Sequence, residues 1–385
     1  MRSAIENHHR KLSGRFQRHG RWSRVRPSLA AVVIATGLAV PTVTAVPAGA
    51  AAPSPRYVYV VNSQSGTVSV INTMTNKVVT TIPVGDNPLE VAFSPSGARI
   101  YVTNQGTDTV SVINTTTNKV IANIAVDDHP LGIAISPFGT RAYVTNTQSD
   151  TVTVIDALTN RVIDVIPVGH NPFRVAASPN RPRVYVTNQD SDTVSVINTM
   201  TNRVIATVPV GHHPFGVVAS PSGARVYVTN QDSDTVSVID AVTNKVVATI
   251  PAGRHPFRIA ITPDGARAYV TNLDSDLVSV IDAVTNKVVA TIPVGHNPFG
   301  VAISPSGARV YVTNLGANTV SVIDAVTNKV VATIPVGDEP FGVAAASIVR
   351  PSRAPITVRR PQGRPHRSEA TSQEGQGQGQ RQRQG

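Results

Sequence analysis

Short runs of Val, Ile and Ala, separated by clusters of Gly, Pro, Asn, Asp and Ser, fill the middle of this chain. One such stretch predicts four strands, over residues 267–272, 277–281, 287–294 and 299–304. The polar segments LDSD, DAVTN, GHNP and PSG lie between or after these runs and predict turns. Within DAVTN, Asn286 is the residue expected to take a left-handed backbone conformation.

The pattern repeats with a fixed period of 42 residues. Seven Tyr mark it, each followed by Val and then, one residue later, by Asn: Tyr59, Tyr101, Tyr143, Tyr185, Tyr227, Tyr269 and Tyr311. Four strands per unit predict an all-β, seven-bladed β-propeller with four antiparallel strands per blade, over residues 56–347. The first unit supplies three strands and residues 341–346 supply one, so pairing of this last strand with the first three would close the ring.

The recurring segments YVTN, TVSVID, TNKVVATIPVG, PFG and SPxG resemble those of the YVTN-repeat β-propeller family of exported and surface-layer proteins. The resemblance covers about 290 of the 385 residues and implies a seven-bladed fold related to the lactonase-like propellers. It implies function only loosely, because similar propellers serve as adhesive surface layers, lactonases and parts of redox enzymes. Two departures are Val61, which replaces Thr, and residues 180–182 (NRP), which replace the usual Ser-Gly turn.

The start of the chain differs from the repeats. A polar, Arg-rich segment precedes the apolar residues 29–40 and the small residues 48–50 (AGA), so residues 1–50 predict a secretory signal peptide, followed by a short linker over residues 51–55. An uncleaved anchor over residues 29–46 is the alternative, whereas cleavage predicts no stable membrane insertion. Both readings predict a secreted, extracellular or cell-surface-associated protein.

The net charge of +11 is concentrated at the two ends. Residues 1–55 carry eight Lys or Arg and one Glu, and residues 348–385 carry eight Arg and two Glu. Of 34 basic and 23 acidic residues, the repeats therefore keep 18 and 20, and without excess positive charge they predict no nucleic-acid partner. The Arg-, Pro-, Gly- and Gln-rich segment 348–385 is expected to be disordered, either as a solubilising tail or as an electrostatic tether to an anionic surface.

Several kinds of chemistry are excluded by residue type. The chain has no Cys, which excludes disulfides, thiol nucleophiles and Cys-ligated metals. It also lacks G-x-S-x-G, H-E-x-x-H, P-loop and Rossmann glycine patterns. These tests do not apply to a propeller enzyme, whose site would be assembled from several blades.

The loops that lead into the innermost strands, of the form G-x-x-P in six of seven units, are expected to border the central channel at one face. Their variable positions hold six of the ten His: the pairs are Asp86-Asn87, Asp128-His129, His170-Asn171, His212-His213, Arg254-His255, His296-Asn297 and Asp338-Glu339. A ring of His and Asp suits a divalent metal or an anionic ligand. The metal candidates are Asp128, His170, His212 and His296, and the ligand-binding candidates are His129, His213 and His255. The alternative is that all of them are polar turn residues.

The residue two after the loop Pro is Gly in four units and charged in three, as Glu90, Arg174 and Arg258. Facing the channel, these three would break its symmetry and are candidates for binding a small molecule there. The alternative is that the three side chains form a surface cluster near the edge of the channel, in which their charges neutralise one another. Asp pairs in three turns after YVTN offer too few oxygens for Ca²⁺ and are expected to be solvated: Asp190/Asp192, Asp232/Asp234 and Asp274/Asp276.

Two functions from different classes stay open. A non-catalytic binding, adhesion or cell-surface module is favoured, because SVIDAVTNKVVATIP recurs in three units and repeated surfaces suit multivalent contact with a cell-surface or cell-wall component or another protein. The alternative is a lactonase-like or lyase-like enzyme with a metal or ligand site at the channel mouth. A redox subunit has less support, since no haem attachment motif is present. The sequence requires no cofactor, and a divalent metal is the one it could accommodate.

Overall fold

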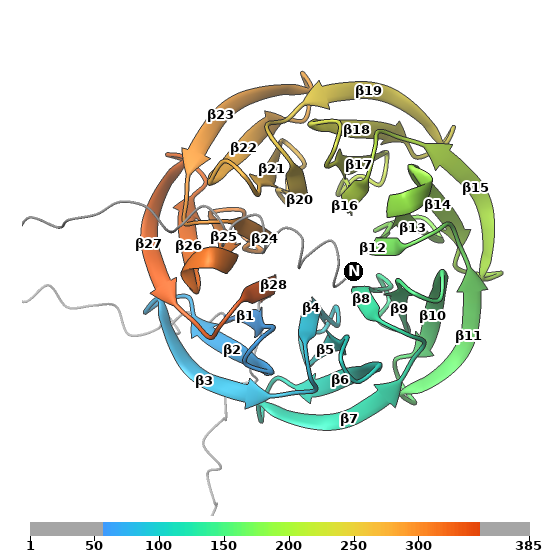
Figure 1. Cartoon of the computed structure of the whole chain (residues 1–385), viewed down its shortest axis with the longest axis horizontal. Coiled ribbons are helices and arrows are strands. Elements are labelled where there is room, and N and C mark those ends of the chain that lie inside the picture. Colours follow the sequence, from blue (N-terminus) through green and yellow to red (C-terminus); the bar gives the residue numbers. More distant parts are fainter. Residues whose placement is uncertain (1–56, 347–385) are drawn as a thin grey trace, which may run out of the picture. The chain divides into compact units, whose positions relative to one another are not determined.

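The computed structural model describes residues 57–346, so the predicted signal peptide, linker and tail lie outside the described residues. This part of the chain forms 28 strands. They make seven four-stranded antiparallel sheets, arranged as blades around a central axis (Figure 1). The structure confirms the predicted seven-bladed propeller. Between residues 57 and 346, no helix is long and apolar enough to cross a membrane.

Each sheet is built outward from the channel. The innermost strands begin at the loop Pro: β4 (Pro88–Phe93), β8 (Pro130–Ile135), β12 (Pro172–Ala177), β16 (Pro214–Ala219), β20 (Pro256–Ile261), β24 (Pro298–Ile303) and β28 (Pro340–Ala346). The second strands end on the Asn of YVTN or its first-unit counterpart: β1 (Tyr57–Asn62), β5 (Arg99–Asn104), β9 (Arg141–Asn146), β13 (Arg183–Asn188), β17 (Arg225–Asn230), β21 (Arg267–Asn272) and β25 (Arg309–Asn314).

The third strands carry the TVSVI-type segment: β2 (Thr67–Asn72), β6 (Thr109–Asn114), β10 (Thr151–Asp156), β14 (Thr193–Asn198), β18 (Thr235–Asp240), β22 (Leu277–Asp282) and β26 (Thr319–Asp324). The outermost strands begin with Lys or Arg: β3 (Lys77–Pro83), β7 (Lys119–Ala125), β11 (Arg161–Pro167), β15 (Arg203–Pro209), β19 (Lys245–Pro251), β23 (Lys287–Pro293) and β27 (Lys329–Pro335). Two 3₁₀ turns, η1 (Gln189–Ser191) and η2 (Leu315–Ala317), join second to third strands.

The predicted strand boundaries in the unit that starts at Arg267 agree with the structure to within one residue. Asn286 has a φ of 55°, which confirms the expected left-handed position in that hairpin. Sequence pattern locates these elements well because β-branched side chains and turn residues act locally.

The ring closes as predicted. The last strand, β28, joins β1, β2 and β3 in one sheet. Tyr57 of β1 lies opposite Ala346, and Val60 lies opposite Val343. This pairing gives the first three strands their inner neighbour, so the closing blade has the same four strands as the others.

Burial follows the position of a strand within its blade. The four central residues of the second and third strands are buried throughout, because both faces of a blade pack against neighbouring blades. The outermost strands are mostly exposed, apart from one buried position such as Ile82 of β3, which lies between exposed Thr81 and Pro83. The seven repeat Tyr are at most 2% exposed and form the largest side chains of the core.

Two residues of YVTN join neighbouring blades. Tyr101 donates from its hydroxyl to the carbonyl of Ala157 (3.3 Å), and Thr103 donates from Oγ1 to the carbonyl of Leu131 (2.7 Å) in the next innermost strand. The Thr bond recurs in all six YVTN units. In the first unit, Val61 has no hydroxyl and cannot make this hydrogen bond. The departure in sequence therefore removes one hydrogen bond between the closing blade and its neighbour.

The Asn of YVTN explains the Gly of the innermost loops. Asn230 donates from Nδ2 to Thr235 (3.0 Å) and Ser237 (2.9 Å) of its own third strand. A Cβ at Gly211 would lie only 2.7 Å from Cγ of this Asn, so no larger residue fits there. The two motifs are therefore in contact, although 19 residues separate them.

Candidate functional site

Seven apolar side chains, one per blade, meet around the channel. We call them the collar: Leu89, Leu131, Phe173, Phe215, Phe257, Phe299 and Phe341. Ring centroids of neighbours lie 3.7–4.2 Å apart from Phe173 round to Phe341, and none of the seven is more than 6% exposed. The collar therefore excludes water at this level of the channel. The sequence contains a signal for the collar that was not among the predicted site residues: a Leu or Phe follows every loop Pro.

The three charged exceptions come together directly after the collar positions. We call Glu90 of β4, Arg174 of β12 and Arg258 of β20 the triad. Both Arg side chains donate to the same carboxylate oxygen, Oε2 of Glu90. The side chains of Glu90 and Arg258 are 5% and 7% exposed, and that of Arg174 is 14% exposed. The three side chains converge as expected and form a buried ion cluster. The cluster contains two positive groups and one negative group, so its charge is only partly neutralised.

Glycines in the intervening blades allow the triad to form. A Cβ at Gly132 would lie 2.7 Å from the carbonyl oxygen of Phe173, and one at Gly216 would lie 2.7 Å from that of Phe257. No side chain fits at these two positions. Glu90 and the two Arg can therefore reach one another across blades that contribute only backbone at this level.

Arg258 is in an unusual environment for a cation. Burial lowers its pKa to about 9, because desolvation disfavours the charged guanidinium. Its guanidinium carbon lies 6.0 Å from the centroid of the Phe299 ring. Its Nε is buried and has no hydrogen-bond partner within residues 57–346.

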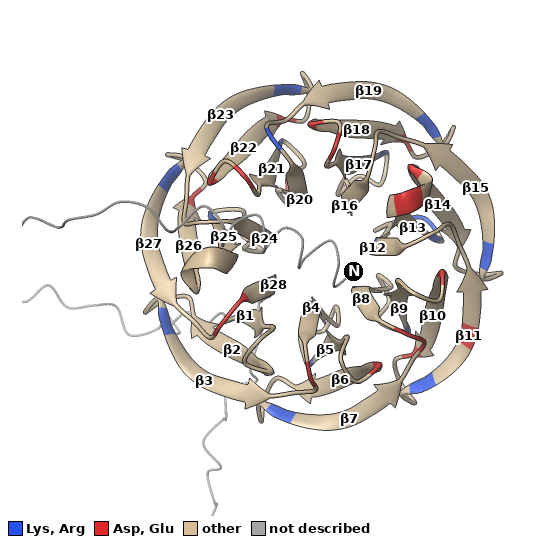
Figure 2. Cartoon of the chain, in the orientation of Figure 1, with Lys and Arg blue, Asp and Glu red and all other residues tan. Residues whose placement is uncertain are grey.

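Five of the seven innermost loops are held by an Asp residue from the preceding blade. Asp150 accepts the backbone N–H of Asn171 (2.7 Å), and Asp192 accepts that of His213 (2.8 Å). In all seven loops the residue before Pro has a positive φ between 48° and 58°. The carboxylate contact therefore helps to hold a backbone conformation that His adopts at some cost, and the amide oxygen of Asn318 accepts the N–H of Glu339 in the same way (3.0 Å). Acidic segments lie in loops inside the ring of outermost strands, each of which carries a basic segment (Figure 2).

Each of these Asp carboxylates accepts the loop N–H with one oxygen. In three of the four metal candidates, the His side chain contacts the second oxygen of such a carboxylate. His170 contacts Asp150 from Nδ1 (2.8 Å), and His212 contacts Asp192 (2.7 Å). His296 pairs in the same way with Asp276 (3.1 Å). The backbone of Asp128 is held by a different group, Ser149. Each of the four belongs to a separate loop.

Two of the three ligand candidates at the second loop position also pair with an Asp. His213 contacts Asp232 and His255 contacts Asp274, each from Nδ1. Nδ1 of His129 is buried without a hydrogen-bond partner in the described part of the chain. The two Asp of each pair after YVTN therefore have different partners. One accepts a backbone N–H of the next innermost loop, and the other contacts a His or Asn side chain.

A metal site at the channel mouth does not assemble from these side chains. Residues 57–346 contain no group of three or more His, Asp or Glu placed to hold a metal ion. The structure does not bring Asp128, His170, His212 and His296 together, because each is attached to its own blade. The contacts that are present fit the alternative reading, in which His and Asp stabilise the loops.

We expect His170 to titrate above its ordinary pKa. The hydrogen bond that the His170 ring donates to the Asp150 carboxylate raises the pKa of His170 above 6.5, with the charges of Asp150 and Asp190 in support. A raised folded-state pKa means that this pair stabilises the fold fully below pH 6.5, and the contribution is lost as pH rises through the raised value. An NMR titration of the His170 ring would measure the shift. Asp150→Asn should lower the pKa, whereas Asp164→Asn on β11 should not; a His170 pKa at or below 6.5 contradicts the assignment.

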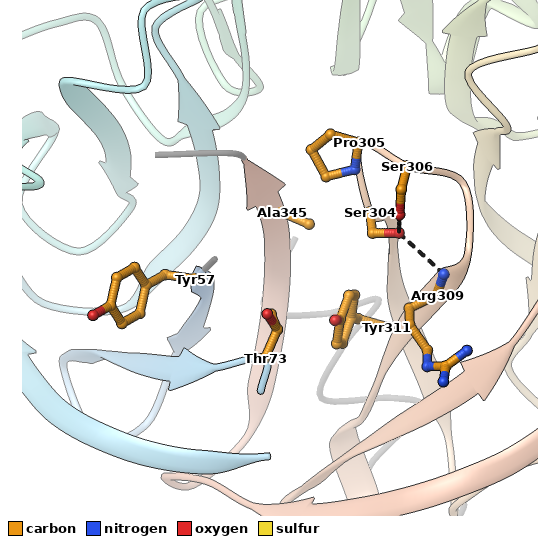
Figure 3. A pocket seen from close by; sticks show the side chains of 8 residues that line it. All are labelled: Tyr57, Thr73, Ser304, Pro305, Ser306, Arg309, Tyr311 and Ala345. Atoms are coloured by element: carbon orange, nitrogen blue, oxygen red, sulfur yellow. Dashed lines mark hydrogen bonds between the residues drawn. The ribbon is translucent and has the colours of Figure 1, made fainter. Parts of the chain in front are cut away.

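A pocket of about 90 Å³ lies at the seam between β25 and the closing blade, lined by Tyr57, Thr73, Ser304, Pro305, Ser306, Arg309, Tyr311 and Ala345 (Figure 3). Arg309 turns to Asp324 of its own blade, whereas the equivalent Arg99 and Arg267 donate to backbone carbonyls of the next blade. The volume is far below the ~300–1,000 Å³ of small-molecule sites. The pocket is therefore too small to hold such a molecule.

The comparisons with known proteins agree on the fold. A family model described as YNCE-like beta-propeller matches residues 175–274 and 245–349. Hydrazine synthase of Kuenenia stuttgartiensis superposes with a TM-score of 0.62 at 24% identity, over 67% of this chain and 89% of that one. A functionally unknown protein from Desulfotomaculum acetoxidans gives a TM-score of 0.69 at 17% identity, over 75% and 98%.

A third structure, the dihydro-heme d1 dehydrogenase NirN in complex with DHE, superposes with a TM-score of 0.58 at 18% identity, over 77% of this chain and 67% of that one. Among curated protein sequences, none matched. At these identities the similar structures establish the propeller architecture and carry no activity over to this chain.

Proposed function

Because the chain is a seven-bladed β-propeller of the YVTN-repeat type, we propose that it is an exported, non-catalytic module that binds an anionic cell-surface polymer through repeated contacts on its outer rim. The single observation that carries this proposal is an exposed apolar side chain at the same place in every outermost strand. Export rests on the signal peptide predicted over residues 1–50, which lies outside the described residues.

The seven apolar residues are 46–56% exposed, and we call them the rim: Val79, Ile121, Ile163, Ile205, Val247, Val289 and Val331. Each is the extra residue of a β-bulge. In β3, for example, Val70 lies opposite Thr80 and Ile71 opposite Val78, so Val79 has no partner on β2. Isolated exposed apolar residues are common on protein surfaces, but seven at one repeated position form a regular array.

A cation accompanies every rim residue. The first residue of each outermost strand, two before the rim residue, is Lys or Arg: Lys77, Lys119, Arg161, Arg203, Lys245, Lys287 and Lys329. Bulges and charges on an edge strand discourage direct strand pairing between copies. The rim therefore favours contacts made by side chains, in which a cation and an apolar group meet a partner that is itself repetitive and negatively charged.

Repetition compensates for weak individual contacts. One exposed ion pair contributes ~0–1 kcal/mol, which is too little for stable binding alone. When contacts are linked in one rigid ring, each later contact is intramolecular, and avidity can exceed single-site affinity by ~10²–10⁴. A polymer with regularly spaced charges satisfies this geometry better than a single small ligand.

The lactonase-like or lyase-like alternative lacks an assembled set of reacting groups within residues 57–346. Five of the six His side chains of the channel mouth contact an Asp residue of an adjacent loop, and within residues 57–346 no three of these groups gather for metal binding. No specific contact favours catalysis, and we do not extend the proposal to it.

Removal of three rim side chains should weaken binding at least tenfold. The mature protein would be titrated with isolated cell-envelope material, and the fraction bound measured by sedimentation. Val247→Ser, Val289→Ser and Val331→Ser combined remove apolar contacts without changing charge. Loss of three contacts at ~0.5–1 kcal/mol each corresponds to this factor or more. Lys245→Gln, Lys287→Gln and Lys329→Gln combined should have a similar effect and should reduce the salt dependence.

The matched control is Thr249→Ser, Thr291→Ser and Thr333→Ser combined, at exposed positions two residues further along the same strands. It should bind within twofold of the unmodified protein. No retention of the unmodified protein on envelope material, or full retention of the rim variant, would overturn the proposal. Binding that disappears after protease treatment of the envelope would assign the partner to protein and reject the polymer.

A further inference from the structure

The triad holds more positive than negative charge in a buried place. Two guanidinium groups share one carboxylate, and the second cation has no other carboxylate: the salt bridges of Arg174 and Arg258 in the described residues both end on Glu90. The cluster therefore carries one excess positive charge. Burying a charge without a partner costs several kcal/mol, so a protein that keeps such a charge usually pairs it with another group.

An unused donor lies at the same place. Nε of Arg258 is buried without a hydrogen-bond partner in the described part of the chain, whereas its Nη2 donates to Glu90. A buried N–H that has lost water and gained nothing costs about 1–3 kcal/mol. Excess charge and unused donor belong to one guanidinium, so one acceptor would satisfy both.

We propose that the triad binds one small monocarboxylate inside the propeller, with Arg258 as the principal ligand and Arg174 as the second. A charge of −1 balances the cluster. A carboxylate suits guanidinium because its two oxygens match the planar fork of N–H donors. The apolar collar beside the triad excludes water, which strengthens the attraction. Arg174, the most exposed of the three side chains, marks the side on which the triad meets solvent.

This inference is independent of rim binding. The triad lies on the innermost strands and the rim on the outermost ones (Figure 1). The asymmetry at the residue after each collar position, charged in three blades and Gly in four, is unnecessary for a ring of equal surface contacts. A site for one small ligand requires such asymmetry.

Isothermal titration calorimetry with sodium acetate tests the proposal. The full mature protein, in low-chloride buffer, should bind one acetate per chain in a saturable manner, and sodium chloride at equal concentration should compete weakly. Arg258→Met and Arg174→Met should each weaken acetate binding at least tenfold. Glu90→Gln removes the competing carboxylate and should strengthen it several-fold. Arg181→Met, the same change in the turn before β13, should stay within twofold of the unmodified protein.

The absence of saturable acetate binding to the unmodified protein would overturn the proposal. So would unchanged binding in Arg258→Met, or chloride binding as tight as acetate. If the Arg variants fail to fold, the unmodified protein decides: its melting temperature should rise with acetate at fixed ionic strength and not with chloride, and no difference rejects the site. Rim variants should bind acetate normally, so failure of either proposal can be recognised separately.

Discussion

A chain that ends at Glu339, and so lacks β28, is expected to lose the cooperative unfolding transition of the full propeller. Phe341 and Val343 of β28 are 4% and 6% exposed, and their burial contributes about 3–6 kcal/mol together. The carbonyl of Phe341 also accepts a hydrogen bond from Thr313 (2.9 Å). Such a loss approaches the whole stability of a typical domain. It would also leave β1 as an unpaired edge inside the ring, which promotes aggregation.

Thermal and guanidinium unfolding, followed by circular dichroism, would measure this effect. The matched control is a chain that ends at Ser347, which keeps β28 and removes only segment 348–385. This control should melt within a few degrees of the full chain, because the predicted tail is not expected to contribute to the core. If the chain ending at Glu339 keeps a sharp transition at the original temperature, closure by β28 does not hold the ring together.

Glu90→Gln is expected to lower the free energy of unfolding by about 3–5 kcal/mol at low salt. The substitution keeps the shape of the side chain but leaves two buried guanidinium groups without a carboxylate. Removal of one partner from a buried ion cluster typically has this cost, because the remaining charges stay desolvated.

Denaturant unfolding of Glu90→Gln and of the double variant Glu90→Gln/Arg258→Met separates charge from packing. If the uncompensated charge is the cause, the double variant should be more stable than Glu90→Gln, since it buries one cation fewer. A further loss of stability in the double variant would show that Arg258 contributes through packing. Added acetate should stabilise Glu90→Gln more than the unmodified protein if the proposed anion site is correct.

Fold prediction from this sequence succeeded because each signal was local and repeated. The Val and Ile runs around YVTN, the turn residues and the 42-residue period specify the same four strands in seven copies. A strand pattern that arose by chance in one unit would not recur in the other six, so the repetition separates true strand signals from chance ones. The lone last strand further indicated how the ring closes, and sheet order confirms it.

The triad could be singled out in the sequence because it breaks the repeat. Glu90, Arg174 and Arg258 differ from the Gly of the other units, and this contrast is visible without a structure. The contacts of the loop His could not be read from the sequence. Five of the six contact an Asp about 20 residues earlier or later in the chain, and no group of three metal-binding side chains forms within residues 57–346.

The sequence by itself determined the strands, the blade number and the closing strand, since these follow from hydrophobic period and turn chemistry along the chain. Only the tertiary structure decided which side chains meet. Glu90 and Arg258 are separated by 168 residues and join one ion cluster because the ring brings the innermost strands β4, β12 and β20 to a common axis. The collar and the excess charge beside it depend on distances across that axis, and a distance between blades is not encoded in any single repeat.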